Sequence, residues 1–68
     1  MEDVEYFYTE YDGKYIVNIC TYRNDDVDVQ MFVNGKAVEN STDLISLEDL
    51  QADIKLKAYK PRMISISK

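Results

Sequence analysis

Few side chains in this sequence could support catalysis or bind a metal. There is no histidine, so the thiol of Cys20 has no imidazole base, and its place within a run of strand-forming residues suits a small packing side chain. Asp25-Asp26-Val27-Asp28 groups three carboxylates but lacks the glycine and the distal glutamate of a calcium loop. Asn34-Gly35-Lys36 has neither the glycine spacing nor the following helix of a phosphate loop. We therefore predict no enzymatic activity, no catalytic residue, no metal site and no cofactor.

Tyrosine is the residue type that sets this chain apart. Five of the six tyrosines lie in the first 22 residues, interleaved with Glu5, Glu10 and Asp12. One sheet in a chain of this length cannot bury all of them, so some must be exposed. Tyrosine gives a large contact area at a low entropic cost, so exposed tyrosines among carboxylates are typical of a protein-binding surface. The alternative is that they cover the rim of the core and stabilise cross-strand pairs.

Length and composition indicate one small domain, residues 1–68, with a thin core. A domain of this size buries only about 60% of the surface of its unfolded chain. No apolar run approaches the roughly 20 residues that span a bilayer, and the acidic residues 1–5 are unlike a signal peptide. Cys20 cannot form an internal disulfide, which fits a reducing compartment. We expect a cytoplasmic protein of the host cell, with no membrane partner.

The net charge of -5 is unevenly placed along the chain. Residues 1–34 hold eight acids against two bases, whereas residues 35–68 hold five acids against six bases. Affinity for free nucleic acid comes from Lys and Arg that displace counterions, so direct nucleic-acid binding is not expected of the acidic half. A basic surface would attract it. The predicted partner is therefore a host protein or ribonucleoprotein complex with a basic surface.

Strand-forming residues and turn signals predict an antiparallel sheet. Residues 4–10, 15–22 and 27–33 are rich in β-branched and aromatic residues, and Asn34-Gly35 is typical of a two-residue hairpin turn. This turn pairs Val33 with Lys36. The register predicts one face in the core and one face exposed to solvent. The core face carries Val27, Val29, Met31, Val33 and Val38, and the solvent-exposed face carries Asp28, Gln30, Phe32, Ala37 and Glu39.

The turn Asp12-Gly13 leaves two registers open for the first hairpin. A two-residue type I′ turn places Tyr8 opposite Val17, whereas a three-residue loop with Gly13 in the bulge position places Tyr8 opposite Ile16. The two registers put the side chains of the first strand on opposite faces of the sheet. We favour the bulged form, which leaves Tyr6 and Tyr8 on the more polar face.

A helix is predicted over residues 47–52. Ser46-Leu47-Glu48-Asp49 matches a capping box with the serine at the N-cap, and apolar residues at helical spacing follow it. Residues 54–58 also alternate as a strand does, so beyond residue 54 helix and strand both stay open. Pro61 ends whichever structure precedes it. Residues 63–68 alternate, and either add a short edge strand or form a tail.

Together these elements predict an α+β fold, an antiparallel sheet of about four strands with one helix packed on one face. The alternative is an all-β small barrel with a short helix. We expect the second turn, residues 23–26, to bring the third strand beside the second, so that one outer face collects aromatic, amide and acidic side chains. Contact is predicted through Tyr8, Tyr22, Gln30 and Phe32, with charge complementarity from Glu10, Asp12, Asp25, Asp26 and Asp28.

One family resemblance spans residues 4–52. It rests on Tyr8, Asn18-Ile19 with Tyr22, Val33-Asn34-Gly35-Lys36 with Val38, and Ser46 with Glu48 and Leu50. This order of a tyrosine-bearing strand, a hairpin and a Ser-capped helix resembles small phage anti-CRISPR proteins that inhibit a type I-F CRISPR surveillance complex. The resemblance implies a plug that sits on the subunits holding the guide RNA and blocks target DNA from pairing. It implies contact through Tyr8 and Tyr22, with Gln30 where the family has an acid.

Three functions follow from these features. The favoured one is a non-enzymatic, phage-encoded inhibitor that binds a host nucleic-acid-handling complex, with CRISPR effectors first. The second is a small nucleic-acid-binding β-barrel that stacks bases on its aromatics and contacts phosphates through the basic side chains of residues 55–68. The third is an interaction subunit of a larger complex, a monomer or a homodimer formed through its exposed aromatic face.

Overall fold

The structure is a computed structural model that describes residues 3–68, and this range consists of strands, turns and loops without a helix. Its strands, in chain order, are β1 (Val4–Tyr11), β2 (Lys14–Thr21), β3 (Val27–Val29), β4 (Phe32–Val33), β5 (Lys36–Ala37), β6 (Ser41–Asp43), β7 (Asp49–Leu50), β8 (Ile54–Leu56) and β9 (Arg62–Ser67). The predicted α+β class is therefore wrong. The all-β alternative fits better, although its short helix is absent from the described range.

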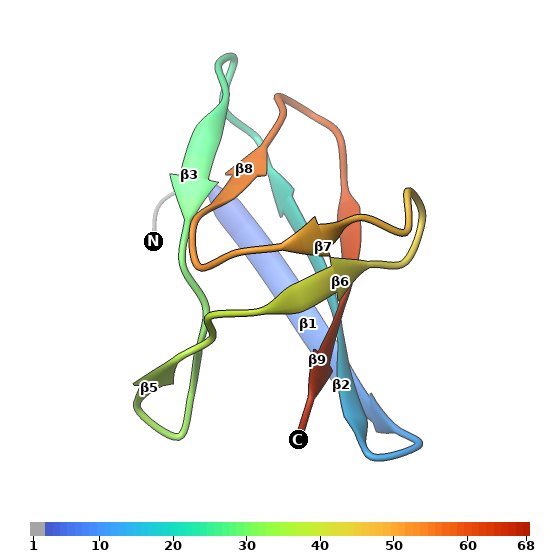
Figure 1. The fold of residues 1–68 in the computed structure, drawn as a ribbon. Helices are drawn as coiled ribbons and strands as arrows, with labels where there is room; N and C mark the ends of the chain where they lie inside the picture. Colours follow the sequence, from blue (N-terminus) through green and yellow to red (C-terminus); the bar gives the residue numbers. More distant parts are fainter. Residues whose placement is uncertain (1–2) are drawn as a thin grey trace.

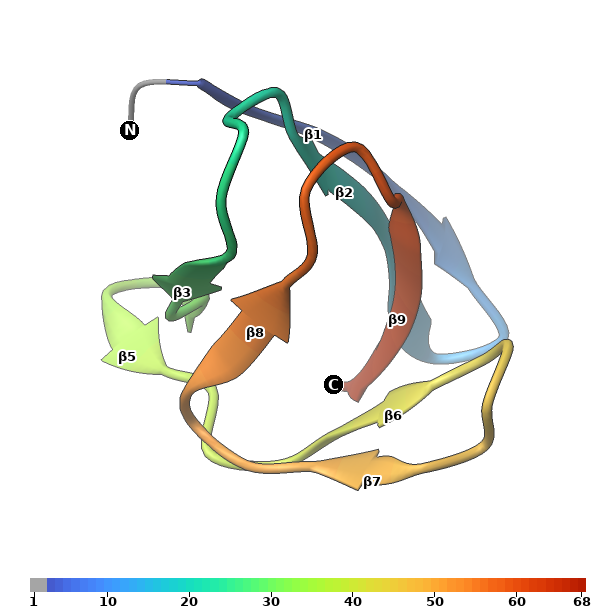
Figure 2. The same cartoon turned by 90° about the horizontal axis from the view of Figure 1, so that it is seen from above.

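Within residues 3–68 the strands form a five-stranded antiparallel sheet, in the order β1-β2-β9-β6-β7, and two ribbons, β3-β8 and β4-β5. Seen from above, the large sheet curves around one side of the molecule, and β3 and β8 lie across from β2 and β9 (Figure 2). The β1–β2 turn and the loop before β3 lie at opposite ends (Figure 1). The sheet and the β3–β8 ribbon thus enclose a shared interior.

The core fills this interior with aliphatic side chains from β2, β3, β8 and β9. Its buried members are Val17, Ile19, Val29, Ile54, Leu56, Ile64 and Ile66. Burying each such side chain contributes about 1.5–3 kcal/mol, so these contacts dominate the stability of so small a domain. The two faces predicted for residues 27–39 are confirmed: Val27, Val29, Met31, Val33 and Val38 are buried or half-buried, whereas Asp28, Gln30, Phe32, Ala37 and Glu39 are exposed.

β9 lies in the middle of the large sheet, between β2 and β6. The prediction of a short edge strand or a tail for residues 63–68 is therefore wrong. Ile64 lies opposite Val17 on one side and opposite Asp43 on the other. Both Ile64 and Ile66 are buried, so β9 supplies core side chains that the sequence alternation had assigned only to an edge.

The predicted pairing of the second and third strands is also wrong, because β3 pairs with β8. The chain leaves the sheet after Thr21, whose buried hydroxyl accepts the N–H of Arg23 at 3.2 Å. The carbonyl of Thr21 accepts the N–H of Tyr59 at 3.3 Å. The side of β2 that β3 would have used is thus occupied by the segment that leads into β9.

The predicted helix over residues 47–52 is replaced by a turn and an extended segment. One carboxylate oxygen of Asp43, Oδ1, accepts the N–H groups of Ile45 at 2.8 Å and Ser46 at 2.9 Å. Ser46 Oγ accepts the N–H of Glu48, two residues further on, at 3.4 Å, which closes a turn instead of capping a helix. Leu47 has a φ of 64°, in the left-handed region. The capping-box residues are therefore turn residues here.

Residues after this turn are extended. Thr42 in β6 lies opposite Asp49 in β7, and β8 pairs with β3 so that Val27 lies opposite Leu56. Of the two structures left open for residues 54–60, the strand is confirmed over β8. Ile54 and Leu56 are buried there, and Lys55 between them is exposed, as the strand alternation predicts.

Both hairpin turns have two residues with positive φ, the type I′ conformation. Asn34 and Gly35 have φ values of 52° and 80°, and the pairing of Val33 with Lys36 is confirmed. In the first hairpin Asp12 has a φ of 52° and Gly13 of 74°. The favoured bulged register is therefore wrong, and the two-residue alternative is confirmed, with Tyr8 opposite Val17.

Candidate protein-binding groove

The two-residue turn decides which side chains of β1 face the interior. Tyr6 lies opposite Ile19, and Tyr8 lies opposite Val17. Residues opposite each other in an antiparallel pair point to the same face, so both tyrosines share the concave face of the core. Yet Tyr6 is 67% and Tyr8 60% exposed, because β1 extends the sheet one strand beyond the part that the β3–β8 ribbon covers.

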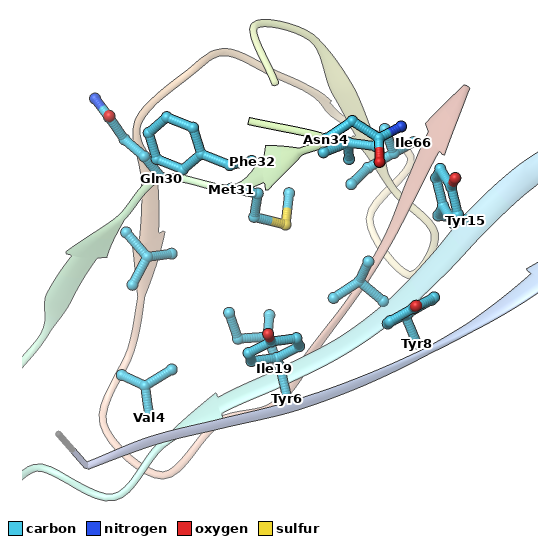
Figure 3. Close-up of a pocket in the computed structure, with 13 residues that line it drawn as sticks. Val4, Tyr6, Tyr8, Tyr15, Ile19, Gln30, Met31, Phe32, Asn34 and Ile66 are labelled. Carbon is cyan, nitrogen blue, oxygen red and sulfur yellow. The ribbon is translucent and has the colours of Figure 1, made fainter. Parts of the chain in front are cut away.

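A cavity of about 490 Å³ lies in front of these tyrosines. Figure 3 shows β1 and β2 on one side of the cavity and the segment from Gln30 to Asn34 on the other. The side chain of Met31 points from this segment toward β1 and β2. The lining residues are Val4, Tyr6, Tyr8, Tyr15, Val17, Ile19, Val29, Gln30, Met31, Phe32, Val33, Asn34 and Ile66. We call this cavity the tyrosine groove. Its wall is mostly apolar, with phenol and amide groups placed around it.

One end of the tyrosine groove is held by contacts around Tyr15. The rings of Tyr8 and Tyr15 meet edge to face, with centroids 5.8 Å apart. Lys68 Nζ lies 5.0 Å from the centroid of Tyr15 and 2.9 Å from Glu10 Oε1. The hydrogen bond with Glu10 raises the pKa of Lys68, so this cation stays charged. These contacts orient Tyr8 before any partner binds.

The opposite wall is the segment from Gln30 to Asn34, whose Met31 side chain points toward β1 and β2, whereas the side chains of Gln30 and Phe32 lie at the outer side of the wall (Figure 3). Gln30 Nε2 donates to Asp53 Oδ1 at 2.7 Å, which fixes the amide beside the groove. Phe32 is 62% exposed, and it lies in β4 opposite Ala37, a side chain too small to cover it. An exposed phenylalanine on a short hairpin offers apolar area to a partner at little conformational cost.

Three of the four predicted contact residues come together in this groove, namely Tyr8, Gln30 and Phe32. The fourth, Tyr22, does not. Its hydroxyl donates to Glu5 Oε2 at 3.1 Å, and Glu5 lies opposite Cys20 on the convex face of the sheet. The expectation that Tyr8 and Tyr22 share one face depended on the bulged register and on a meander, and both are wrong.

The predicted acidic residues form two groups and not one patch. Glu10 and Asp12 lie at the β1–β2 turn, whereas the other three lie around the start of β3, at the opposite end (Figure 1). There Asp25 is paired with Arg23 at 3.0 Å, which lowers its pKa. Asp26 Oδ1 accepts the N–H of Ala58 at 3.3 Å, and Asp28 lies opposite Lys55. Asp25 and Asp26 thus have partners within the molecule, and Asp28 faces a lysine across the β3–β8 ribbon.

Sequence reasoning missed several lining residues of the groove. Tyr6 was placed with Tyr8 but not among the contact residues, Met31 was assigned only to the core face, and Val4 was assigned only to the first strand. The alternation of Val4, Tyr6 and Tyr8 at every second position was the signal that could have found them. Only with the two-residue turn at Asp12-Gly13 does this alternation place the three side chains on the face of the sheet that lines the groove.

Comparisons of the chain with protein-family models, with curated proteins and with solved structures found no match. Among residues 3–68 there is no helix of the length and hydropathy needed to cross a bilayer. The same range contains no group of three or more Cys, Asp or Glu side chains that could hold a metal ion.

Proposed function

We propose that this chain is a non-enzymatic protein-binding domain whose contact surface is the tyrosine groove. The observation that carries the proposal is the exposure of Tyr6, Tyr8 and Phe32, each at least 60% exposed, around one apolar cavity. Each aromatic side chain can bury about 150–250 Å² in an interface. Tyrosines held on a sheet lose little conformational freedom on binding, which favours their use as anchors of an interface.

The charge of the molecule supports a basic partner. The net charge is -5, and such a charge speeds association with a positively charged surface and disfavours binding to free nucleic acid. An inhibitor of a host nucleic-acid-handling complex fits this chemistry, because such complexes present basic grooves. A type I-F CRISPR surveillance complex is the target that the family resemblance implies, and it stays a prediction.

The experiment is a binding assay with matched tyrosine variants. The full chain is tagged and used to capture partners from bacterial lysate and, separately, to bind a purified type I-F surveillance complex. Tyr8→Ala is compared with Tyr59→Ala, because both tyrosines are 60% exposed and Tyr59 does not line the groove. We expect Tyr8→Ala and Phe32→Ala each to weaken binding by a factor of about 30 or more, the range of interface anchors.

Equal binding by the Tyr8→Ala and Tyr59→Ala variants would contradict the groove as the contact surface. Loss of binding only in Tyr22→Ala would place the contact on the convex face instead. Binding of oligonucleotides that weakens steeply with salt would favour the nucleic-acid-binding alternative. A mass that rises with concentration would favour a self-associating subunit.

A further inference from the structure

The edge of β1 carries unpaired backbone groups that belong to the same residues as the groove. Opposite residues of an antiparallel pair alternate between hydrogen-bonded and non-hydrogen-bonded, and a two-residue turn begins with a hydrogen-bonded pair, here Tyr11 and Lys14. The backbone N–H and C=O groups of odd-numbered residues of β1 therefore form hydrogen bonds with β2. The hydrogen bond from the N–H of Tyr22 to the carbonyl of Asp3, at 2.8 Å, continues the same pattern. The N–H and C=O groups of Tyr6 and Tyr8 point away from β2.

This edge is long, and its only charged side chains are the carboxylates of Glu5 and Glu10. β1 pairs with β2 over eight consecutive residues without a bulge, and it contains no Lys and no Pro. Natural sheets block edges with such residues, with bulges or with very short edge strands. The other edge of the same sheet, β7, has two residues. Within residues 3–68 the sheet therefore protects one edge by shortness and leaves the other open.

We infer that an extended segment of a partner protein adds to β1 as a further strand of the sheet. This inference rests on the proposed function and names the way in which the groove is filled. Alternate side chains of the added strand point to the concave face, where the tyrosine groove accepts apolar groups. Main-chain hydrogen bonds to Tyr6 and Tyr8 supply affinity, and the groove supplies selectivity, as in other strand-addition complexes.

Charge decides which segment fits the convex side of the added strand. Residues 3–13 contain four acids and no base. Lys68 neutralises Glu10, whereas the partner that Glu5 has among residues 3–68 is the neutral hydroxyl of Tyr22. Phe7, 67% exposed, lies on the same face as Glu5 and offers its ring to a cation. A segment with apolar residues at one set of alternate positions and Lys or Arg at the other therefore complements both faces of β1.

The same charge disfavours a second copy of this chain as the occupant. Two copies joined through β1 would bring together two acidic edges on molecules that each carry a net charge of -5. Opposite charges across neighbouring strands stabilise a pair, and like charges destabilise it. The partner is thus a different protein with an amphipathic, cationic extended segment.

Synthetic peptides of about eight residues, a typical strand length, test the inference on the full chain. One peptide alternates Val and Lys, a second has the same composition in two blocks, and a third alternates Val and Glu. Binding is followed by calorimetry and by amide hydrogen exchange. We expect the alternating Val/Lys peptide to bind at least about tenfold more tightly than the other two. The amides of Tyr6 and Tyr8 should become protected on binding, whereas those of Phe7 and Thr9 are protected already.

Two variants of Tyr6 distinguish the contribution of its backbone N–H to peptide binding from that of its ring. Tyr6→Pro removes the outward N–H together with the ring, and proline is tolerated on an edge strand where its nitrogen faces solvent. Tyr6→Ala removes only the ring. We expect Tyr6→Pro to bind the peptide about tenfold more weakly than Tyr6→Ala, the effect of one lost hydrogen bond. If Tyr6→Pro does not fold, a peptide methylated on its edge-facing nitrogens gives the same comparison on the wild-type chain.

Equal binding of the alternating and block peptides would overturn strand addition, as would binding without protection of the Tyr6 and Tyr8 amides. Protection of these amides that rises with protein concentration alone would show that a second copy occupies the edge, and would overturn the assignment to a cationic partner. If no peptide binds while Tyr8→Ala still abolishes capture of a partner, strand addition fails and the groove remains the contact surface. If Tyr8→Ala and wild type capture the same partner equally, the proposed function itself fails.

Discussion

Arg62 holds the buried carboxylate of Asp43 through two nitrogens, Nε and Nη2, each 2.9 Å from Oδ2. The third nitrogen of the same guanidinium, Nη1, donates to the carbonyl of Lys55 at 2.8 Å. One side chain at the start of β9 thus joins the end of β6 to β8. The remaining oxygen of Asp43 is bonded to the turn that follows β6. Arg62 therefore belongs to the structural framework, and it is not a free member of the basic C-terminal stretch.

Replacing Arg62 by alanine is expected to destabilise the fold severely. The variant leaves a buried carboxylate without its cation, which costs about 3 kcal/mol. A domain of this length has a free energy of unfolding of only roughly 3–10 kcal/mol, so Arg62→Ala should lose about a third of it or more. Urea denaturation followed by circular dichroism measures the loss. Lys57→Ala, a change at an exposed base, should alter the free energy of unfolding by less than about 0.5 kcal/mol.

Stability should fall at acidic pH because of Asp43. Burial alone would raise the pKa of this carboxyl, but the N–H groups of Ser46 and Ile45 together with the Arg62 guanidinium outweigh burial and hold the pKa below its usual 3.8. A carboxyl with a lower pKa in the folded chain contributes stability above its unfolded value and loses that contribution as pH falls through the folded value. The free energy of unfolding should therefore decrease as pH drops below 3.8.

Urea denaturation at a series of pH values measures this dependence. Asp43→Asn should be less stable than wild type at neutral pH, and the difference should shrink as the pH falls. If the two proteins keep a constant difference down to the lowest pH, other carboxyl groups cause the acid dependence.

Leu47 offers a test of the turn that replaces the predicted helix. Its φ of 64° lies in the left-handed region, which is less favourable by roughly 1–2 kcal/mol for any residue with a Cβ atom than for glycine. Leu47→Gly should therefore be more stable than Leu47→Ala by about 1 kcal/mol. In a helix the order is reversed, because glycine is about 1 kcal/mol less favourable there than alanine. The sign of the difference in urea denaturation decides between the two structures.

Tyr22 should ionise at higher pH than an isolated tyrosine. Its hydrogen bond to Glu5 and the negative charge of that carboxylate both raise the pKa of the phenol above 10.0. The chemical shift of the Tyr22 ring, followed by NMR through an alkaline titration, gives the midpoint. Glu5→Gln should lower this midpoint, and Glu10→Gln should leave it unchanged. A midpoint that does not respond to Glu5→Gln would show that the hydroxyl of Tyr22 is not bonded there in solution.

Local signals in the sequence predicted the turns better than the pairings. Asn34-Gly35 specified its own hairpin, because few sequences adopt two consecutive positive φ values. Asp12-Gly13 carried the same kind of signal but suits both a two-residue and a three-residue turn. The choice of register therefore depended on which faces of β1 and β2 are buried. At Ser46 the signal itself was ambiguous, since a serine hydroxyl that caps a helix can also close a turn.

Non-local relationships were not available from the sequence. Nothing near Ile64 or Ile66 indicates that β9 would lie beside β2, because that pairing depends on what covers the apolar side of β2. The tyrosine groove depends on the same kind of information. Tyr8 and Phe32 could be singled out by type, but that both line one cavity follows from the path of the chain between β2 and β4. Tyr22 was misplaced for the same reason.

The central position of β9 has a consequence for how the chain folds. The β1–β2 and β4–β5 hairpins have local turns and can form within about 1–10 μs, but an isolated hairpin is marginally stable. The pairing of β2 with β9 joins segments from opposite ends of the sequence, and contacts of such separation slow folding toward about milliseconds to seconds. Until β9 arrives, β2 lacks a neighbour on one side and β6 has no sheet to join. Folding should therefore be limited by the capture of β9, and the tyrosine-bearing hairpin should form and break many times before that step.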